Sequence, residues 1–143
     1  MVGHRRDNMV IKECTDDDLD VLAIFNKQLI DDEDSNNNMN IDELKERMKG
    51  FISTTYKAFL FITEENIYGY ALVNIAKNPY YLRQFFIVRE FRQNGYGKIA
   101  LSLLLDELKT TEIDLEVLSN NERGISFWRS CGFREYSKYM KLT

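Results

Sequence analysis

Apolar residues recur every three or four positions in two segments near the start of the chain, a spacing typical of amphipathic helices. The first segment predicts a helix over 16–30, preceded by a short strand over 9–13. The second predicts a helix that begins after Asn40, whose side chain forms a capping box with Glu43. The polar segment 31–40 between them is predicted to be a loop.

The pattern then changes to short runs rich in β-branched and aromatic residues. Residues 57–64 and 67–75 are two such runs separated by a polar turn, which predicts a hairpin. Gly69 lies inside the second run, which predicts a β-bulge or a close neighbour at that point. Residues 80–88 are largely apolar and predict a strand that is covered on both faces.

Helices and strands alternate in the last part of the chain. A leucine-rich helix is predicted over 97–109, and residues 113–118 alternate as a strand. A helix that ends at Gly132 follows, and the alternating tail 134–142 predicts a last strand. The order βααβββαβαβ predicts an α/β fold with a single mixed central β-sheet flanked by helices. The length predicts a single domain over 1–143.

Charge and composition exclude several classes of function. The net charge is −4 and no cluster of Lys and Arg is present, so we expect no nucleic-acid partner. No apolar run approaches the ~18 residues of a membrane span, so we expect no membrane association and a cytoplasmic location. Cys14 and Cys131 are expected to be packed thiols without a disulfide. The one histidine, His4, lies near the N-terminus, which argues against histidine catalysis.

Two glycines at the start of the leucine-rich helix carry the main chemical signal. Gly95 and Gly97 could be a structural turn that needs only permissive dihedrals. A Walker phosphate loop is excluded because Ile99 follows Lys98 where a magnesium-binding Ser or Thr is required. A dinucleotide-binding fold is disfavoured, because too few residues follow Gly97 to build its second half.

A fourth explanation uses the residues before the glycines as well. Residues 92–97 have the form R-x-x-G-x-G and Lys98 follows them. Such a turn directs successive main-chain amides outward at the positive end of a helix, where a pyrophosphate binds without a metal. The motif, with its basic flanks Arg92 and Lys98, resembles the acyl-CoA signature of the GNAT superfamily of N-acetyltransferases.

The resemblance extends to both sides of the loop. The apolar run 85–88 stands where the family binds the pantetheine arm through the main chain of a strand. Downstream, the family pattern of asparagine, an aromatic pair and Gly-Phe is matched at Asn121, at Phe127 with Trp128, and at 132–133. The resemblance implies acetyl-CoA as cofactor, no metal, and coenzyme contacts from Phe86, Ile87, Val88, Arg92, Gln93, Asn94, Gly95, Tyr96, Gly97, Lys98, Asn121, Phe127 and Trp128.

The resemblance also implies a reaction. An acetyl group would pass from acetyl-CoA to a primary amine of a small molecule or peptide, by direct attack in a ternary complex. The strands 82–88 and 113–118 would part at a bulge, with the thioester in the gap. A main-chain amide of the first strand would stabilise the oxyanion. Because a free alkylamine titrates near ~10.4, a base must supply its neutral form.

The catalytic side chains are less closely specified. Trp128 takes the place of the tyrosine that is often the general acid of the family, and an indole N–H cannot protonate a thiolate. Tyr136 is a candidate replacement. Glu116 is the candidate base because it alternates with apolar neighbours on a strand, although an acid facing solvent would show the same pattern. Trp128 also suggests an alternative function, a non-catalytic acyl-CoA-binding regulatory domain of the same fold.

Four residues are candidates for the acceptor site. Asp32 and Glu33 end the first helix, Gln28 lies one turn earlier, and Gln84 lies on the strand before the loop. Acids at a helix C-terminus oppose its dipole, and a cationic acceptor would offset that cost. A solvated acidic loop is the alternative. A monomer or a homodimer is compatible with the sequence.

Overall fold

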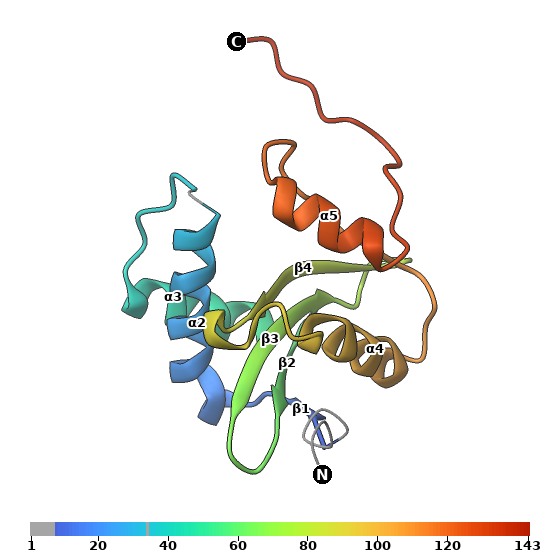
Figure 1. Ribbon diagram of the computed structural model, residues 1–143. Helices are drawn as coiled ribbons and strands as arrows, with labels where there is room; N and C mark the ends of the chain where they lie inside the picture. The colour runs from blue at the N-terminus through green and yellow to red at the C-terminus, as the bar shows by residue number, and fades with distance from the viewer. Residues whose placement is uncertain (1–7, 34) are drawn as a thin grey trace.

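A five-stranded sheet in the order β1-β2-β3-β4-β5 forms the centre of the computed structural model (Figure 1). The first four strands pair antiparallel and β5 pairs parallel with β4, so the sheet is mixed. The structure describes residues 8–33 and 35–143, and His4 lies outside them. The strands are β1 Val10–Glu13, β2 Tyr56–Ile62, β3 Ile67–Asn74, β4 Tyr80–Ile87 and β5 Ile113–Asp114.

Helices flank both faces of this sheet. The helices α2 and α3 lie together on one side and α4 lies on the other (Figure 1). In the described part of the chain, the helices are α2 Leu19–Asp32, α3 Ile41–Ile52, α4 Tyr96–Leu108 and α5 Glu122–Ser130, with short 3₁₀ turns η1 Asp16–Asp18 and η2 Arg89–Phe91. The predicted α/β class, with one mixed sheet flanked by helices, is confirmed.

Local sequence signals account for how the helices begin. The Asn40 carboxamide oxygen accepts a hydrogen bond from the Glu43 amide at 2.8 Å, and the Glu43 carboxylate accepts one from the Asn40 amide at 2.9 Å. The predicted capping box of α3 is therefore confirmed. Each bond satisfies an N–H group that a helix start would otherwise leave unpaired.

The sheet buries side chains on both faces. On β2, Phe59 and Phe61 pack in the cluster that contains Ala100 and Leu104 of α4. The intervening residues Ala58 and Leu60 pack against α2 and α3. Successive strand residues point to opposite faces, so a continuous apolar run is what two covered faces require.

Gly69 is required by a close approach between neighbouring strands. A Cβ at this position would lie 1.9 Å from the Phe86 carbonyl oxygen on β4. The register of β3 with β2 also shifts between Phe61 and Ile62, opposite this part of β3. The prediction of a bulge or a close neighbour at Gly69 is thus confirmed on both counts.

A second irregularity occurs in β4. Leu72 pairs with Gln84 and the next residue, Val73, pairs with Leu82, so Arg83 is an extra residue in β4. On its other side β4 pairs with β5 only at Tyr80 and Tyr81. Beyond those two pairs the strands separate, which confirms the predicted parting of the two parallel strands at a bulge. The predicted strand over 113–118 is correspondingly shorter.

The strand predicted over 134–142 is not formed, and that prediction was wrong. The segment is extended, runs away from the sheet (Figure 1) and has no backbone hydrogen bond to the described residues. An alternating pattern forms a strand only where another chain segment supplies ladder partners. Because β5 offers just two paired residues, the tail finds no ladder there.

Two further chemical features are plain in the described ranges. Cys14 is buried and Cys131 is half-buried, and both are free thiols. Burial raises the pKa of the Cys14 thiol to about 12, so this side chain is a packed thiol at neutral pH. Among residues 8–33 and 35–143, no helix has the length and apolar character needed to cross a bilayer.

The contact at Gly69 leads to a stability prediction. Gly69→Ala should lower the free energy of unfolding by about 3 kcal/mol, because the new Cβ would overlap a backbone carbonyl that cannot move freely. Gly50→Ala is the matched control, since a Cβ there meets nothing within 4 Å. It should stabilise α3 by about 0.5 to 1 kcal/mol. Urea unfolding of both variants measures this; equal effects would contradict the prediction.

Candidate active site

The parting of β4 and β5 lies beside the start of α4. After Tyr81, no described residue of β5 pairs with the outer edge of β4. The chain then leaves β4 through η2 and the loop 92–95, and α4 begins at Tyr96. The site therefore combines an unpaired strand edge with a helix N-terminus, which are two sources of main-chain hydrogen-bond donors.

The loop before α4 has the geometry of an anion-binding turn. Gln93 and Gly95 both adopt left-handed backbone conformations, with φ of 65° and 83°. Alternating handedness turns successive amides toward one side of the chain. No hydrogen bond to another described residue involves the main-chain N–H groups of Gln93, Asn94, Gly95, Gly97 and Lys98. Several unpaired donors at the positive end of a helix fit a diphosphate group.

Gly97 also has a packing role. A Cβ at Gly97 would lie 2.9 Å from the Phe127 ring of α5. Phe127 stacks on Phe85 with ring centroids 6.1 Å apart, and Trp128 packs against Phe85 and Phe133 at 5.3 and 5.2 Å. Gly97 therefore lets α4 and α5 approach each other, and Trp128 is a packing residue of the aromatic cluster they share with β4.

Asn121 acts as the N-cap of α5. Its carboxamide oxygen accepts a hydrogen bond from the Gly124 amide at 3.0 Å. A Cβ at Gly124 would lie 2.5 Å from the Asn121 carboxamide nitrogen, so the capping side chain occupies that space. This contact explains why a glycine stands here, and it gives Asn121 a structural role at the helix start.

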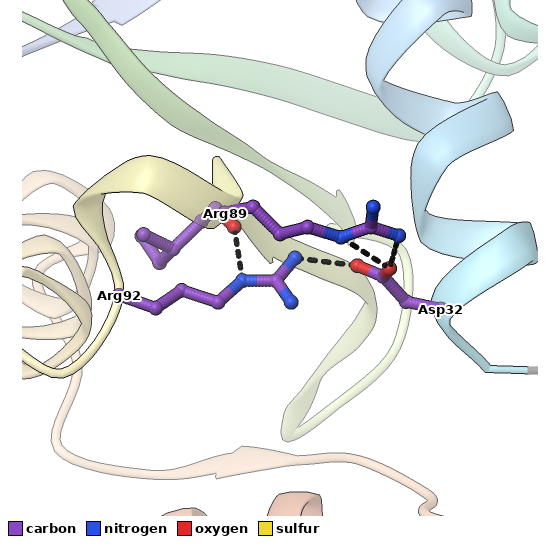
Figure 2. Close-up of polar contacts among 4 residues, drawn as sticks. Asp32, Arg89 and Arg92 are labelled. Atoms are coloured by element: carbon purple, nitrogen blue, oxygen red, sulfur yellow. Dashed lines mark hydrogen bonds and ion pairs between the residues drawn. The ribbon is translucent and has the colours of Figure 1, made fainter.

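A cluster of three charged side chains joins α2 to the loop before α4 (Figure 2). The Asp32 carboxylate accepts hydrogen bonds from the guanidinium groups of Arg89 and Arg92. Arg92 also donates from Nε to the Ile87 carbonyl oxygen at 2.7 Å. We call Asp32, Arg89 and Arg92 the α2–loop ion cluster. It ties the end of β4, the loop and α2 together.

This cluster changes the roles available to two predicted site residues. Burial by itself raises the pKa of Asp32, but the hydrogen bonds from Arg89 and Arg92 outweigh it and hold the pKa below its ordinary value. The Asp32 side chain is only 17% exposed and both its oxygens are engaged. The Asp32 carboxylate is therefore used to hold the loop, and the Arg92 guanidinium is used to bind Asp32.

A cavity of about 360 Å³ opens on the α2 and α3 side of the sheet. We call it the acceptor pocket, after the role proposed for it under Proposed function. Its polar lining comes from α2, α3 and the loop between them, from β4 and from the segment after β5: Asn26, Glu33, Ser35, Asn37, Arg47, Tyr81, Arg83, Gln84 and Glu116. The size is within the range of small-molecule sites.

The bulge in β4 determines which side chains reach this pocket. In a regular strand, successive side chains point to opposite faces. Here Arg83 and Gln84 both line the pocket, because the extra residue shifts the alternation. Gln84 accepts a hydrogen bond from the hydroxyl of the buried Tyr70 at 2.7 Å, which fixes its carboxamide.

Two carboxylates in the pocket have different surroundings. Removal from water raises the pKa of Glu33, and the charge of Asp32 adds to that rise. Glu116 accepts a hydrogen bond from the Tyr81 hydroxyl at 2.6 Å. Burial, and then this bond to Glu116, raise the pKa of Tyr81, so the phenol stays protonated and keeps donating. The bond from Tyr81 holds Glu116 in place. For Glu33, no hydrogen bond from a described side chain offsets the free energy needed to ionise its carboxyl.

The structure brings some of the predicted acceptor and catalytic residues together and separates others. Glu33, Gln84 and Glu116 line one pocket. Gln28 is exposed on α2 outside that lining, and Tyr136 is fully exposed in the extended tail. The tail forms no strand, so nothing positions Tyr136 as an acid.

Sequence reasoning missed several polar residues of the pocket, among them Asn26 and Arg47. Asn26 is 1% exposed and lies one turn from Leu22 and one turn from Ile30, both buried. A polar residue on the buried stripe of a helix was the signal that could have identified it. Arg47 lies on α3, where the sequence pattern alone gives no partner, because its contact with Asn26 joins distant parts of the chain.

Comparison with known proteins identifies the family. Residues 21–133 match the model of the Acetyltransferase (GNAT) family. The chain therefore belongs to the GNAT acetyltransferase family, as its loop motif indicated. No curated protein sequence matches the chain.

Solved structures with the same fold share little sequence with this chain. A possible acetyltransferase from Clostridium difficile 630 has 18% identity and a TM-score of 0.72, over 94% of this chain and 96% of that one. A predicted acetyltransferase from Clostridium acetobutylicum, solved with acetyl-CoA, has 17% identity and a TM-score of 0.71, over 94% and 96%. An aminoglycoside acetyltransferase from an uncultured soil metagenomic sample, solved with sisomicin, has 16% identity and a TM-score of 0.68, over 96% and 97%.

The α2–loop ion cluster leads to a pH-dependent stability prediction. Asp32→Asn should lower the free energy of unfolding at pH 7 by about 1 to 2 kcal/mol, because two arginines lose a charged acceptor. Since the pKa of Asp32 is lowered by folding, this contribution is present above the ordinary carboxyl value of about 3.9 and is lost on further acidification.

Urea unfolding between pH 7 and pH 3 measures this difference. The wild type should lose more stability on acidification than Asp32→Asn does. Asp31→Asn is the control, since it removes the same charge one residue earlier from a side chain that makes no hydrogen bond to the described residues. Parallel pH curves for wild type and Asp32→Asn would contradict the role of the cluster.

Proposed function

We propose that this protein transfers an acetyl group from acetyl-CoA to a primary amine of a small molecule or peptide, by direct attack in a ternary complex. The observation that carries the proposal is the parting of β4 and β5 between an unpaired amide loop and a pocket with two carboxylates. Membership of the GNAT acetyltransferase family supports the same reaction class.

The residues present fit the coenzyme. Amides of Gln93, Asn94, Gly95, Gly97 and Lys98 would hold its diphosphate at the start of α4, and the exposed Lys98 side chain adds a positive charge beside them. The edge of β4 that no described strand pairs with would hold the pantetheine arm between Phe86 and Val88, chiefly through the Ile87 amide, because the Val88 amide and carbonyl already pair with Tyr68 and Phe91. When bound, the coenzyme supplies an acetyl group as a thioester, which is open to attack by an amine.

The acceptor pocket supplies the groups that the amine needs. Glu33 would attract the protonated amine, because a cation there offsets the causes that raise the pKa of this carboxyl, which are desolvation and the neighbouring charge of Asp32. Glu116 would accept the proton that the amine loses, with Tyr81 holding its carboxylate in position. A main-chain amide of β4 beyond the bulge would donate to the oxygen that gains charge during the attack.

The loop assignment is tested by substitutions at Gly97. Gly97→Asp should weaken acetyl-CoA binding about 100-fold or more, because a carboxylate would stand beside the diphosphate. Gly97→Ala is the matched control, since it makes the same contact with Phe127 without a charge. It should weaken binding much less. Calorimetric titration with acetyl-CoA measures both, with circular dichroism to verify folding; equal affinities for the two variants would refute the assignment.

The base assignment is tested by the pH dependence of the rate. Glu116→Gln should lower kcat/KM by about 10² to 10⁴ and remove the acidic limb of the pH profile, with acetyl-CoA affinity unchanged. Asp114→Asn, two residues earlier and outside the pocket lining, should leave the profile intact. Thiol release from acetyl-CoA measures the rate.

The same assay distinguishes the two classes of function. If Glu33→Gln rather than Glu116→Gln removed the acidic limb, the base would be Glu33. Acetyl-CoA binding without thiol release for any amine would favour a non-catalytic acyl-CoA-binding domain, which Trp128 in place of a tyrosine also suggests. No acetyl-CoA binding would overturn the proposed function.

A further inference from the structure

Two arginines in the acceptor pocket have no carboxylate partner. Arg47 and Arg83 both line the pocket, and neither makes an ion pair with any residue in the described ranges. Their guanidinium carbons lie 5.5 and 4.7 Å from the centroid of the same Phe51 ring. Two like charges are thus held near one aromatic side chain without a neutralising anion.

At this end of the pocket, hydrogen-bond donors outnumber hydrogen-bond acceptors. The buried carboxamide oxygen of Asn26 accepts from the Arg47 guanidinium at 3.2 Å. Because arginine only donates, this bond fixes which atom of Asn26 is the oxygen. The Asn26 carboxamide nitrogen and Arg47 Nε are both buried, and neither has a hydrogen-bond partner in the part of the chain that the structure describes. Unpaired buried donors are rare, and each is destabilising by itself.

The electrostatics show the same imbalance. Burial, and then the positive charge of Arg83, lower the pKa of Arg47. A residue that stays charged despite burial and a like charge gains stability when an anion binds. The requirement is for a ligand group rich in hydrogen-bond acceptors and negatively charged, as carboxylates and phosphates are.

The acidic residues Glu33 and Glu116 line the same pocket. It therefore offers carboxylates for an amine and guanidinium groups for an anion. A polyamine or an aminoglycoside carries several positive charges and no anionic group. In this pocket it would lie beside the positive charges of Arg47 and Arg83. Such a juxtaposition disfavours a polycationic acceptor.

We propose that the acceptor is an amine that also carries an anionic oxygen group, as an amino acid or an aminoalkyl phosphate does, and that Arg47 and Arg83 bind this group. The inference rests on the proposed function, because the acceptor is defined by the transfer reaction. Glu33 and Glu116 then receive the amino group of the same molecule. Arg47 and Arg83 are specificity-determining residues and take no part in the bond changes.

The experiment compares acceptors that differ by one charge. Thiol release from acetyl-CoA is measured for L-amino acids beside their C-terminal amides, for phosphoethanolamine beside ethanolamine, and for spermidine and an aminoglycoside. The wild type should prefer an anionic acceptor over its uncharged counterpart by about 10- to 100-fold in kcat/KM, as expected for a charged hydrogen-bonded pair. The amino-acid and phosphate pairs show which anion is recognised.

Variants assign the preference to the two arginines. Arg47→Gln and Arg83→Gln should each reduce the preference to within about threefold, with acetyl-CoA affinity unchanged. Lys49→Gln is the control, since it removes a positive charge from the exposed face of the same helix as Arg47. Arg83 is exposed, so its variant keeps the test valid if Arg47→Gln fails to fold.

The results that would contradict the inference about the acceptor differ from those that would contradict the proposed function. A wild type that prefers spermidine, an aminoglycoside or the uncharged amines overturns the inference and leaves acetyl transfer to amines intact. A preference for anionic acceptors that survives in both arginine variants overturns the assignment to Arg47 and Arg83. Absence of acetyl-CoA binding and of thiol release with every amine overturns the proposed function, and the inference with it.

Discussion

The extra residue at Arg83 in β4 is the constraint on which the rest of the site depends. It places the side chains of Arg83 and Gln84 on the same face, where regular alternation would separate them. It also occurs where β4 and β5 stop pairing, so the following part of β4 pairs with β3 on one side and has an outer edge that no described strand pairs with. One bulge therefore shapes the acceptor pocket and exposes the strand edge proposed to bind the coenzyme.

Gly97 shows that a structural and a binding explanation of the same residue are compatible. It lets Phe127 of α5 approach α4, which the structural explanation requires. Its amide also makes no hydrogen bond to another described residue, as the anion-binding explanation requires. A side chain at this position would disturb the packing of α5 and the access to those amides together, so both requirements select the smallest residue.

Most of the fold was predictable because its causes are local in the sequence. Helix periodicity, the cap at Asn40, the glycine at 69 and the loop 92–97 each depend on neighbouring residues. The ion cluster of Asp32 with Arg89 and Arg92, and the contact of Arg47 with Asn26, join residues far apart in the chain, and no local pattern encodes them. The prediction of a strand over 134–142 was wrong for a related reason, since an alternating pattern does not specify a pairing partner.

The helix α2 belongs to both halves of the active site. It contributes Asn26, and Glu33 directly after its last residue, to the acceptor pocket and, through Asp32, is bound to the loop proposed to hold the coenzyme. A ligand that shifts α2 also changes the free energy of the loop conformation. Thermodynamic linkage then requires the effect to be mutual. If one ligand changes the affinity for the second by some factor, the second changes the affinity for the first by the same factor. The ion cluster thus gives this small protein a physical route to cooperative assembly of the proposed ternary complex.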